Sequence, residues 1–344
     1  MFYPRISVII PFYNVELYIE YCLQSVMQQT YPGSLECILV DDCGTDKSVA
    51  IAEELIAGYK GSIEFKVLHH EHNRGLSAAR NTGMDASTGD YVYFLDSDDW
   101  ISEDCIEKLT EPIQQERFDI VVGGYEMVGT LPYFLELSLP EGRYHESGIS
   151  KTFCNQGVYV MAWNKLYCKE FLQKNHLCFE ESKVHEDEIL AFELSCIEKS
   201  FYVIKSVTYY YRIRENSIVT SDDSMKKILG YLGVLQSVRD KVKRYEKLDG
   251  IYDFYVFWIR RVFRWMSRIE MNEEIQKYVQ DHAEGFLDLI PDVRCLHDKH
   301  NRLAYLLCKE EQTYSRFQYV TNKYANKFQG RILRNVLSFI PSKY

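Results

Sequence analysis

The stretch YVYFLDSDDW, residues 91–100, joins an apolar run to the carboxylates of Asp96, Asp98 and Asp99. The run YVYFL is typical of a buried strand. Like charges this close together repel one another, and a solvated turn or a helix N-cap accounts for one of them, Asp99, but not for all. The carboxylates that follow the strand therefore need a positively charged partner.

A divalent cation is the partner that explains Asp96 and Asp98 together. They leave the strand at positions i and i+2 and can turn toward one point. Mg²⁺ or Mn²⁺ takes one or two protein carboxylates together with phosphate oxygens of a substrate. The stretch thus predicts a site for a metal–diphosphate complex.

Three further apolar runs stand before this stretch: ISVII (6–10), CILV (37–40) and EFKVL (64–68). Segments with apolar residues at helical spacing separate the runs, for example YIEYCLQSVMQQT (18–30) and LSAARNTGMDAS (76–87). This alternation predicts an α/β fold with a doubly wound, mostly parallel sheet flanked by helices.

In such sheets ligands bind beyond the carboxyl ends of the strands. Polar groups follow three of the predicted strands at that edge: residues 11–14 (PFYN), Asp41 with Asp42, and residues 96–99 (DSDD). No G-x-G-x-x-G follows the first strand, so the dinucleotide fingerprint is missing. The pattern indicates a nucleotide site of another kind.

The pattern of apolar and polar residues changes twice in the rest of the chain. From 111 to 222 the pattern is mixed, with a strand at FDIVVGGY (118–125) and helices at MAWNKLY (161–167) and EILAFELSCIE (188–198). From 223 onward helical patterns follow one another. We therefore expect two halves of one α/β domain, 1–110 and 111–222, and a C-terminal all-helical region, 223–344.

Bulk composition excludes several classes of protein. A net charge of −10 argues against a nucleic-acid binder, which needs a basic surface. Ten cysteines without C-x-x-C or zinc spacing predict free thiols in the cytoplasm. A strand begins within six residues of Met1, which predicts no signal peptide. No apolar stretch reaches the ~20 residues that cross a bilayer.

Several motifs together resemble the family 2 glycosyltransferases, which have the GT-A fold. The nucleotide half carries SVIIPFYN, LVDDCGTDKS, NRGLSAARNTG and YFLDSDD. The resemblance continues through WNKLY (163–167), HEDEILAF (185–192) and YYYRIRENSIVTS (209–221), and covers residues 4–221. Cys43 and Gly44 stand where Gly-Ser is commoner in the family, and Gly44 keeps that turn flexible.

The resemblance implies roles for individual residues. The nucleotide-sugar would be bound by the set Pro11, Tyr13, Asn14, Asp41, Asp42, Arg80, Asp96, Ser97, Arg212 and Arg214. Asp98 would be the direct ligand of Mn²⁺ or Mg²⁺, with Asp96 beside it. For Arg80 the alternative is an arginine on the surface of a helix with no role in binding. For Arg212 and Arg214 the alternative is an edge strand in which alternate residues are exposed. Ser217 would add a hydroxyl to the same segment.

Glu186 and Asp187 stand at the start of a predicted helix. Acidic residues favour helix N-termini because of the dipole, and most have no other role. The resemblance implies that Asp187 is the general base, with Glu186 orienting it or contacting the acceptor. For Trp163, Asn164 and Lys165 two interpretations stay open, the wall of a sugar pocket and, for Trp163, core packing. His69, His70 and His72 form a loop for which a metal role is disfavoured.

Two segments of the helical region carry basic stripes. Arg260, Arg261, Arg264 and Arg268 share an arc of one predicted helix. Residues 312–344 contain Lys and Arg but no acidic residue, and the pattern of 327–340 predicts a basic amphipathic helix. Such a helix either binds peripherally in the plane of a membrane or packs onto the protein or a second copy in a homodimer.

Together these observations predict an inverting, metal-dependent glycosyltransferase. Its donor would be a UDP-sugar and its acceptor a saccharide or lipid-linked saccharide. The resemblance to the family alone implies a role in bacterial capsule, O-antigen or related surface glycan synthesis. The chain would work in the cytoplasm or on the inner face of the membrane. A catalytically inactive GT-A scaffold and a sugar-nucleotide nucleotidyltransferase are the alternatives; a glycoside hydrolase leaves Asp41, Asp42 and Asp98 unexplained.

Overall fold

A computed structural model describes residues 3–129, 137–181, 184–213, 224–266, 285–299 and a few isolated positions (269, 273, 278, 301, 302 and 305). The chain divides into two compact units. The first comprises 1–182 and 186–221, and the second comprises 183–185 and 222–344. The main division falls beside residue 222, where the sequence pattern changes from mixed to helical.

The first unit begins with four parallel strands in the order β3-β2-β1-β4. Every residue of β1, β2 and β4 is buried, which explains why these strands read as continuous apolar runs instead of alternating ones. The strands are β1 (Ile6–Phe12), β2 (Leu35–Asp41), β3 (Glu64–His69) and β4 (Tyr91–Phe94).

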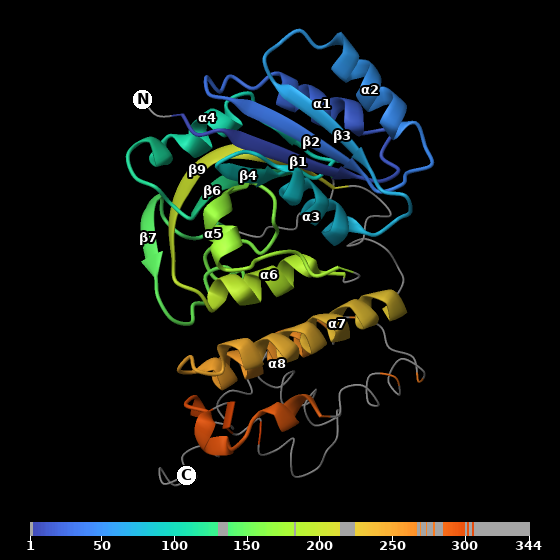
Figure 1. The fold of residues 1–344 in the computed structure, drawn as a ribbon. Coiled ribbons are helices and arrows are strands. Elements are labelled where there is room, and N and C mark those ends of the chain that lie inside the picture. The colour runs from blue at the N-terminus through green and yellow to red at the C-terminus, as the bar shows by residue number, and fades with distance from the viewer. Residues whose placement is uncertain are drawn as a thin grey trace. The chain divides into compact units, whose positions relative to one another are not determined.

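Helices cover both faces of this parallel half. Helices α1 (Ile19–Met27) and α2 (Ser48–Gly58) pack against each other on one side, and α3 (Leu76–Ala86) packs on β1 and β2 from the other (Figure 1). The predicted α/β fold with a doubly wound, mostly parallel sheet flanked by helices is confirmed for this half. All carboxyl ends of the parallel strands lie at one edge, where the predicted site residues stand.

Beyond β4 the sheet becomes mixed. Its order continues β4-β8-β6-β9-β5, and β7 pairs with β9. Strand β8 runs antiparallel to both neighbours, whereas β6 and β9 are parallel. The strands of this part are β5 (Trp100–Ile101), β6 (Ile120–Val128), β7 (Gly142–Glu146), β8 (Lys165–Cys168) and β9 (Lys199–Arg212). Its helices are α4 (Cys105–Thr110), the short turn η1 (Pro112–Gln114), α5 (Lys169–Lys174) and α6 (Glu186–Ser195).

The helix predicted at 161–167 is wrong, because β8 begins at Lys165. Asn164 precedes it with φ at 53°, a left-handed conformation that ends any helix. Its buried side chain accepts hydrogen bonds from Tyr93 (3.1 Å) and Thr208 (2.9 Å) and donates to the Gly124 carbonyl (2.7 Å). Bonds to three strands, β4, β9 and β6, therefore override the helical spacing of the apolar residues.

The second unit is helical where it is described. It contains α7 (Ser224–Val242) and α8 (Ile251–Met266), with short turns η2 (Lys243–Tyr245), η3 (Phe286–Leu289) and η4 (Val293–Cys295). On α8, Arg264 is exposed, and Arg261 packs on Trp265 at 4.5 Å. Arg268 and the basic segment 312–344 lie outside the described residues. None of the described helices has the length and apolar character needed to cross a bilayer.

Candidate active site

The first carboxylates of the site follow β2 and are tied to neighbouring loops. Asp42 is buried and accepts hydrogen bonds from the backbone N–H groups of Arg74 (2.8 Å) and Gly75 (2.7 Å). His70 Nδ1 lies 2.7 Å from the same carboxylate. Gly75 has φ at 88°, so the turn that delivers its N–H favours glycine. Asp42 thereby fixes the loop that leads into α3.

Asp41 and the PFYN segment shape the adjoining loops. Asp41 accepts from the Gly44 backbone N–H at 2.9 Å, and His69 Nδ1 lies 3.2 Å from it. Asn14 accepts from the backbone of Thr45 at 2.7 Å, while Tyr13 is 46% exposed. His69 and His70 thus each contact a carboxylate, Asp41 and Asp42 respectively. The sequence alone did not show these pairs. These bonds join the loops after β1, β2 and β3 into one surface.

The acidic stretch after β4 divides into residues with different surroundings. Asp96 and Asp98 are half-buried, whereas Asp99 is fully buried. Asp99 accepts from the Tyr209 hydroxyl (2.6 Å) and from the Arg212 backbone (2.7 Å), and burial raises its pKa well above the usual range. It therefore joins the turn to β9 and does not cap a helix. Ser97, which stands between Asp96 and Asp98 in the sequence, is also buried.

Arg80 gathers carboxylates from two distant parts of the chain. It donates through Nη2 to Asp96 at 2.8 Å and through Nη1 to Glu186 at 2.6 Å and Asp187 at 3.2 Å. Its side chain is 1% exposed. The strand-end motif and the predicted base are therefore brought together by one guanidinium.

Burial changes the acidity of Asp187. Burial raises the pKa of this carboxyl to about 7. The charge of Arg80 lowers this pKa, whereas the charges of Glu186 and Asp96 raise it further. A carboxylate with a pKa near neutrality suits proton transfer from a hydroxyl. Asp187 thus combines burial with a pKa near neutrality at the start of α6.

The residues that would hold a metal are few. No group of three His, Cys, Asp or Glu side chains that could bind a metal occurs within the described residues. The two half-buried carboxylates Asp96 and Asp98 follow β4, and two carboxylates suffice for a Mg²⁺ or Mn²⁺ ion completed by phosphate oxygens and water. The donor set is compatible with a cation that arrives with a substrate.

The profile of the family described as Glycosyl transferase family 2 matches residues 7–175. This range contains the loops after β1 to β3, Arg80 and the acidic stretch after β4. Residues 7–175 belong to this family. GlyA of Streptococcus pneumoniae, a glycosyltransferase, is 35% identical over 226 residues, which are 62% of this chain and 31% of GlyA.

A second relative and a solved structure are also similar to this chain. The putative glycosyltransferase EpsH of Bacillus subtilis is 34% identical over 63% of this chain and 63% of EpsH. The chain thus matches less than two thirds of the length of these relatives. The crystal structure of Staphylococcus aureus TarS 1–349 in complex with UDP-GlcNAc has a TM-score of 0.73 at 20% identity, covering 93% of this chain and 91% of TarS 1–349, and shares its fold.

The WNK segment of this family 2 domain lies beneath the site and does not line it. Trp163 is 2% exposed and stacks on Tyr209 at 4.5 Å between ring centroids, so core packing is the correct interpretation for it. Lys165 is buried, bonds the Met161 carbonyl and lies 3.8 Å from the Tyr159 ring. Burial lowers its pKa well below the usual value, and the charge of Asp187 opposes this shift.

Arg212 stands next to the acidic stretch in a cradle of aromatic rings. Its Nε donates to the Asp98 carbonyl at 3.0 Å, and its guanidinium lies 4.7 Å from the Trp100 ring. Arg214 and Ser217 lie outside the described residues. Arg212 is thus held beside Asp98 at the end of β9.

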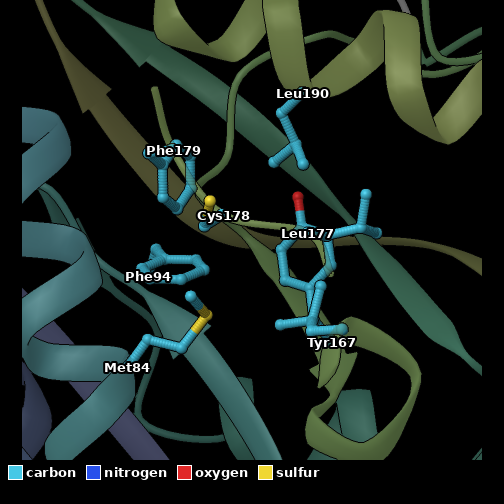
Figure 2. Close-up of a pocket in the computed structure, with 8 residues that line it drawn as sticks. Met84, Phe94, Tyr167, Leu177, Cys178, Phe179 and Leu190 are labelled. Carbon is cyan, nitrogen blue, oxygen red and sulfur yellow. The ribbon is translucent and has the colours of Figure 1, made fainter. Parts of the chain in front are cut away.

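A small apolar pocket lies between α3, β4 and α6. Phe94, Phe179 and Leu190 surround it together with Met84 and Tyr167 (Figure 2). Leu190 stands on α6 one turn after Asp187, and Phe179 also packs against Arg80 at 5.1 Å. The pocket has no charged lining and belongs to the packing behind the carboxylate cluster.

Proposed function

We propose that the chain is a metal-dependent, inverting glycosyltransferase. It transfers a hexosyl or N-acetylhexosaminyl group from a UDP-sugar to a hydroxyl of a saccharide or lipid-linked saccharide, in the synthesis of bacterial surface glycans. The observation that carries this proposal is the buried cluster in which Arg80 joins Asp96, at the end of the parallel strands, to Glu186 and Asp187.

The donor would bind at the carboxyl ends of β1, β2 and β4. Pro11, Tyr13, Asn14, Asp41 and Asp42 would surround the uridine, since the loops that carry them meet at this edge. Asp96 and Ser97 would face the ribose and diphosphate, with Arg212 and Arg214 beside them. A UDP-sugar is favoured because TarS, which shares the fold, has been crystallised with UDP-GlcNAc and with UDP.

Asp98, with Asp96, would hold a Mn²⁺ or Mg²⁺ ion. Such an ion, when bound, would neutralise negative charge on the diphosphate. A mannosyltransferase from Pyrobaculum calidifontis with a similar fold has been crystallised with GDP-Man and Mn²⁺, which supports a cation in this kind of fold.

Asp187 would act on the acceptor. It takes the proton of the acceptor hydroxyl while that oxygen forms a bond to the anomeric carbon. The bond from this carbon to the phosphate oxygen breaks, and UDP leaves with the electron pair. Attack from the face opposite UDP inverts the anomeric configuration. Glu186 shares the Nη1 atom of Arg80 with Asp187 and would orient it.

Two measurements test this function in order. Titration calorimetry of UDP should show binding with Mn²⁺ and little or none with EDTA. A panel of UDP-sugars, beginning with UDP-GlcNAc, is then incubated with saccharide and lipid-linked acceptors, and the anomeric configuration of any product is read by NMR. Metal-dependent binding followed by a product of inverted configuration is the expected outcome; metal-independent binding, or retention, would overturn the proposal.

A further inference from the structure

Helix α3 extends two consecutive side chains toward the segment that leads to α6. Asn81 donates to the carbonyl of Phe179 at 2.7 Å and accepts from the N–H of the same residue at 2.9 Å. A two-way bond of this kind satisfies both backbone groups of a loop residue that lies outside any strand. Asn81 therefore fixes the backbone at Phe179, 98 residues further along the chain.

Arg80, the residue before Asn81, holds the same region from a second side. The ring of Phe179 lies 5.1 Å from the Arg80 guanidinium carbon. The terminal nitrogens of Arg80 bond Asp96, Glu186 and Asp187. The pair 80–81 thus contacts both the loop before α6 and the first turn of α6 itself.

The exposure of these groups shows which of them faces solvent. The side chain of Arg80 is 1% exposed, against 24% for Asp96 and 17% for Asp187. The carboxylates therefore lie between the guanidinium and the solvent. Both terminal nitrogens of Arg80 already bond protein oxygens, and its Nε is buried. A nucleotide approaching this edge would meet the carboxylates before it met Arg80.

We propose that Arg80 and Asn81 form a positioning pair that places the base Asp187 relative to the donor site, and that Arg80 is not a ligand of the nucleotide. The inference rests on the proposed function. Arg80 compensates three carboxylates that would otherwise repel one another, and its planar fork sets the distance between Asp96 and the start of α6. Asn81 holds the backbone of Phe179, whose ring packs against the Arg80 guanidinium, so the two side chains act on the same region.

The test separates turnover from nucleotide affinity in four variants. Arg80→Lys keeps the charge but loses the fork, and Asn81→Ala removes the clamp on Phe179. Asn81→Asp retains only the bond from the Phe179 N–H. Arg74→Met is the matched control, because Arg74 precedes the same helix and pairs with Glu181 at a half-exposed position. For each variant we measure kcat, KM for the UDP-sugar, and the Kd of UDP with Mn²⁺.

Misplacing a catalytic group by about 1 Å costs on the order of 10²-fold in rate. We expect Arg80→Lys to lower kcat by about 10²-fold and Asn81→Ala by about 10-fold, with the Kd of UDP within about 3-fold of the parent. Asn81→Asp should lie between Asn81→Ala and the parent, and Arg74→Met should be unchanged. An equal loss of UDP affinity and turnover in Arg80→Lys would overturn the inference, as would unchanged turnover in Asn81→Ala.

Hydrogen exchange supplies a readout that needs no substrate. In Arg80→Lys and Asn81→Ala, peptides covering 177–181 and 186–190 should exchange faster, while peptides from β1 and β2 keep the parent rate. Unchanged exchange in both peptides, 177–181 and 186–190, would contradict the positioning role. If the parent protein transfers no sugar, the proposed function fails, whereas a fully active Arg80→Lys variant with parent-like exchange defeats this inference alone.

Discussion

The hydroxyl of Tyr209 on β9 donates to Asp99 at 2.6 Å, across 110 residues of sequence. The backbone N–H of Arg212 donates to the other oxygen of the same carboxylate. Asp99 is consequently a structural residue, although it is the direct neighbour of Asp98 in the acidic stretch. This difference between adjacent aspartates leads to the first two predictions.

Asp99→Leu should destabilise the fold. The substitution leaves the Tyr209 hydroxyl and the Arg212 N–H buried without an acceptor, at about 1–3 kcal/mol each. We expect the free energy of unfolding to fall by about 2–4 kcal/mol, and by less than about 1 kcal/mol for Asp99→Asn, whose amide can still bond both groups. Urea unfolding of the three proteins measures this. Equal stability of the Leu and Asn variants would show that these two bonds contribute little.

Asp98→Asn should remove metal-supported UDP binding without changing stability. A neutral amide is a poor ligand for Mg²⁺ or Mn²⁺ compared with a carboxylate. Calorimetry should show no more UDP binding with Mn²⁺ than with EDTA, whereas Asp99→Asn binds as the parent does. If Asp98→Asn retained metal-dependent binding, the cation ligand would have to be sought elsewhere.

Asp187→Asn should keep UDP binding and lose transfer. Loss of a general base typically lowers the rate by 10²–10⁴-fold, so kcat should fall by about that factor while the Kd of UDP changes less than about 2-fold. Glu181→Gln, which alters a half-exposed carboxylate before α6, is the control and should remain active. Near-parent turnover in Asp187→Asn would exclude this residue as the base.

The rate should depend on pH through Asp187, whose pKa is raised to about 7. Only the ionised carboxylate accepts a proton, so kcat/KM should rise about tenfold per pH unit below pH 7 and level off above it. An acidic limb centred near pH 4 would show that Asp187 has an ordinary pKa during turnover.

Stability should change with pH in the opposite sense. A carboxyl whose pKa is higher in the folded state than in the unfolded chain contributes stability below about pH 4, and this contribution is lost as the pH rises through about 7. The stability of Asp187→Asn relative to the parent should therefore increase between pH 5 and pH 8. Urea unfolding at both pH values measures it, and a constant difference would contradict the raised pKa.

Local patterns were sufficient where local forces decide the structure. The apolar runs at 6–10, 37–40 and 91–95 are strands whose side chains are buried in the sheet, whereas the run at 64–68 is a partly exposed strand at the edge, beside β2. The helical spacing at 76–87 also holds. By contrast, the same spacing at 161–167 failed, since the bonds of Asn164 to Tyr93, Thr208 and Gly124 hold a left-handed residue there.

The sequence alone determined that polar residues follow several parallel strands at one edge of a sheet, and it marked 96–99 and 186–187 as acidic. These are consequences of neighbours along the chain. Only the tertiary structure decided that Asp99 serves the fold, that Trp163 and Lys165 lie beneath the site, and that Arg80 and Asn81 reach Phe179 and α6. The partners of these residues lie far away in sequence, so burial and charge compensation become visible only when the chain has brought them together.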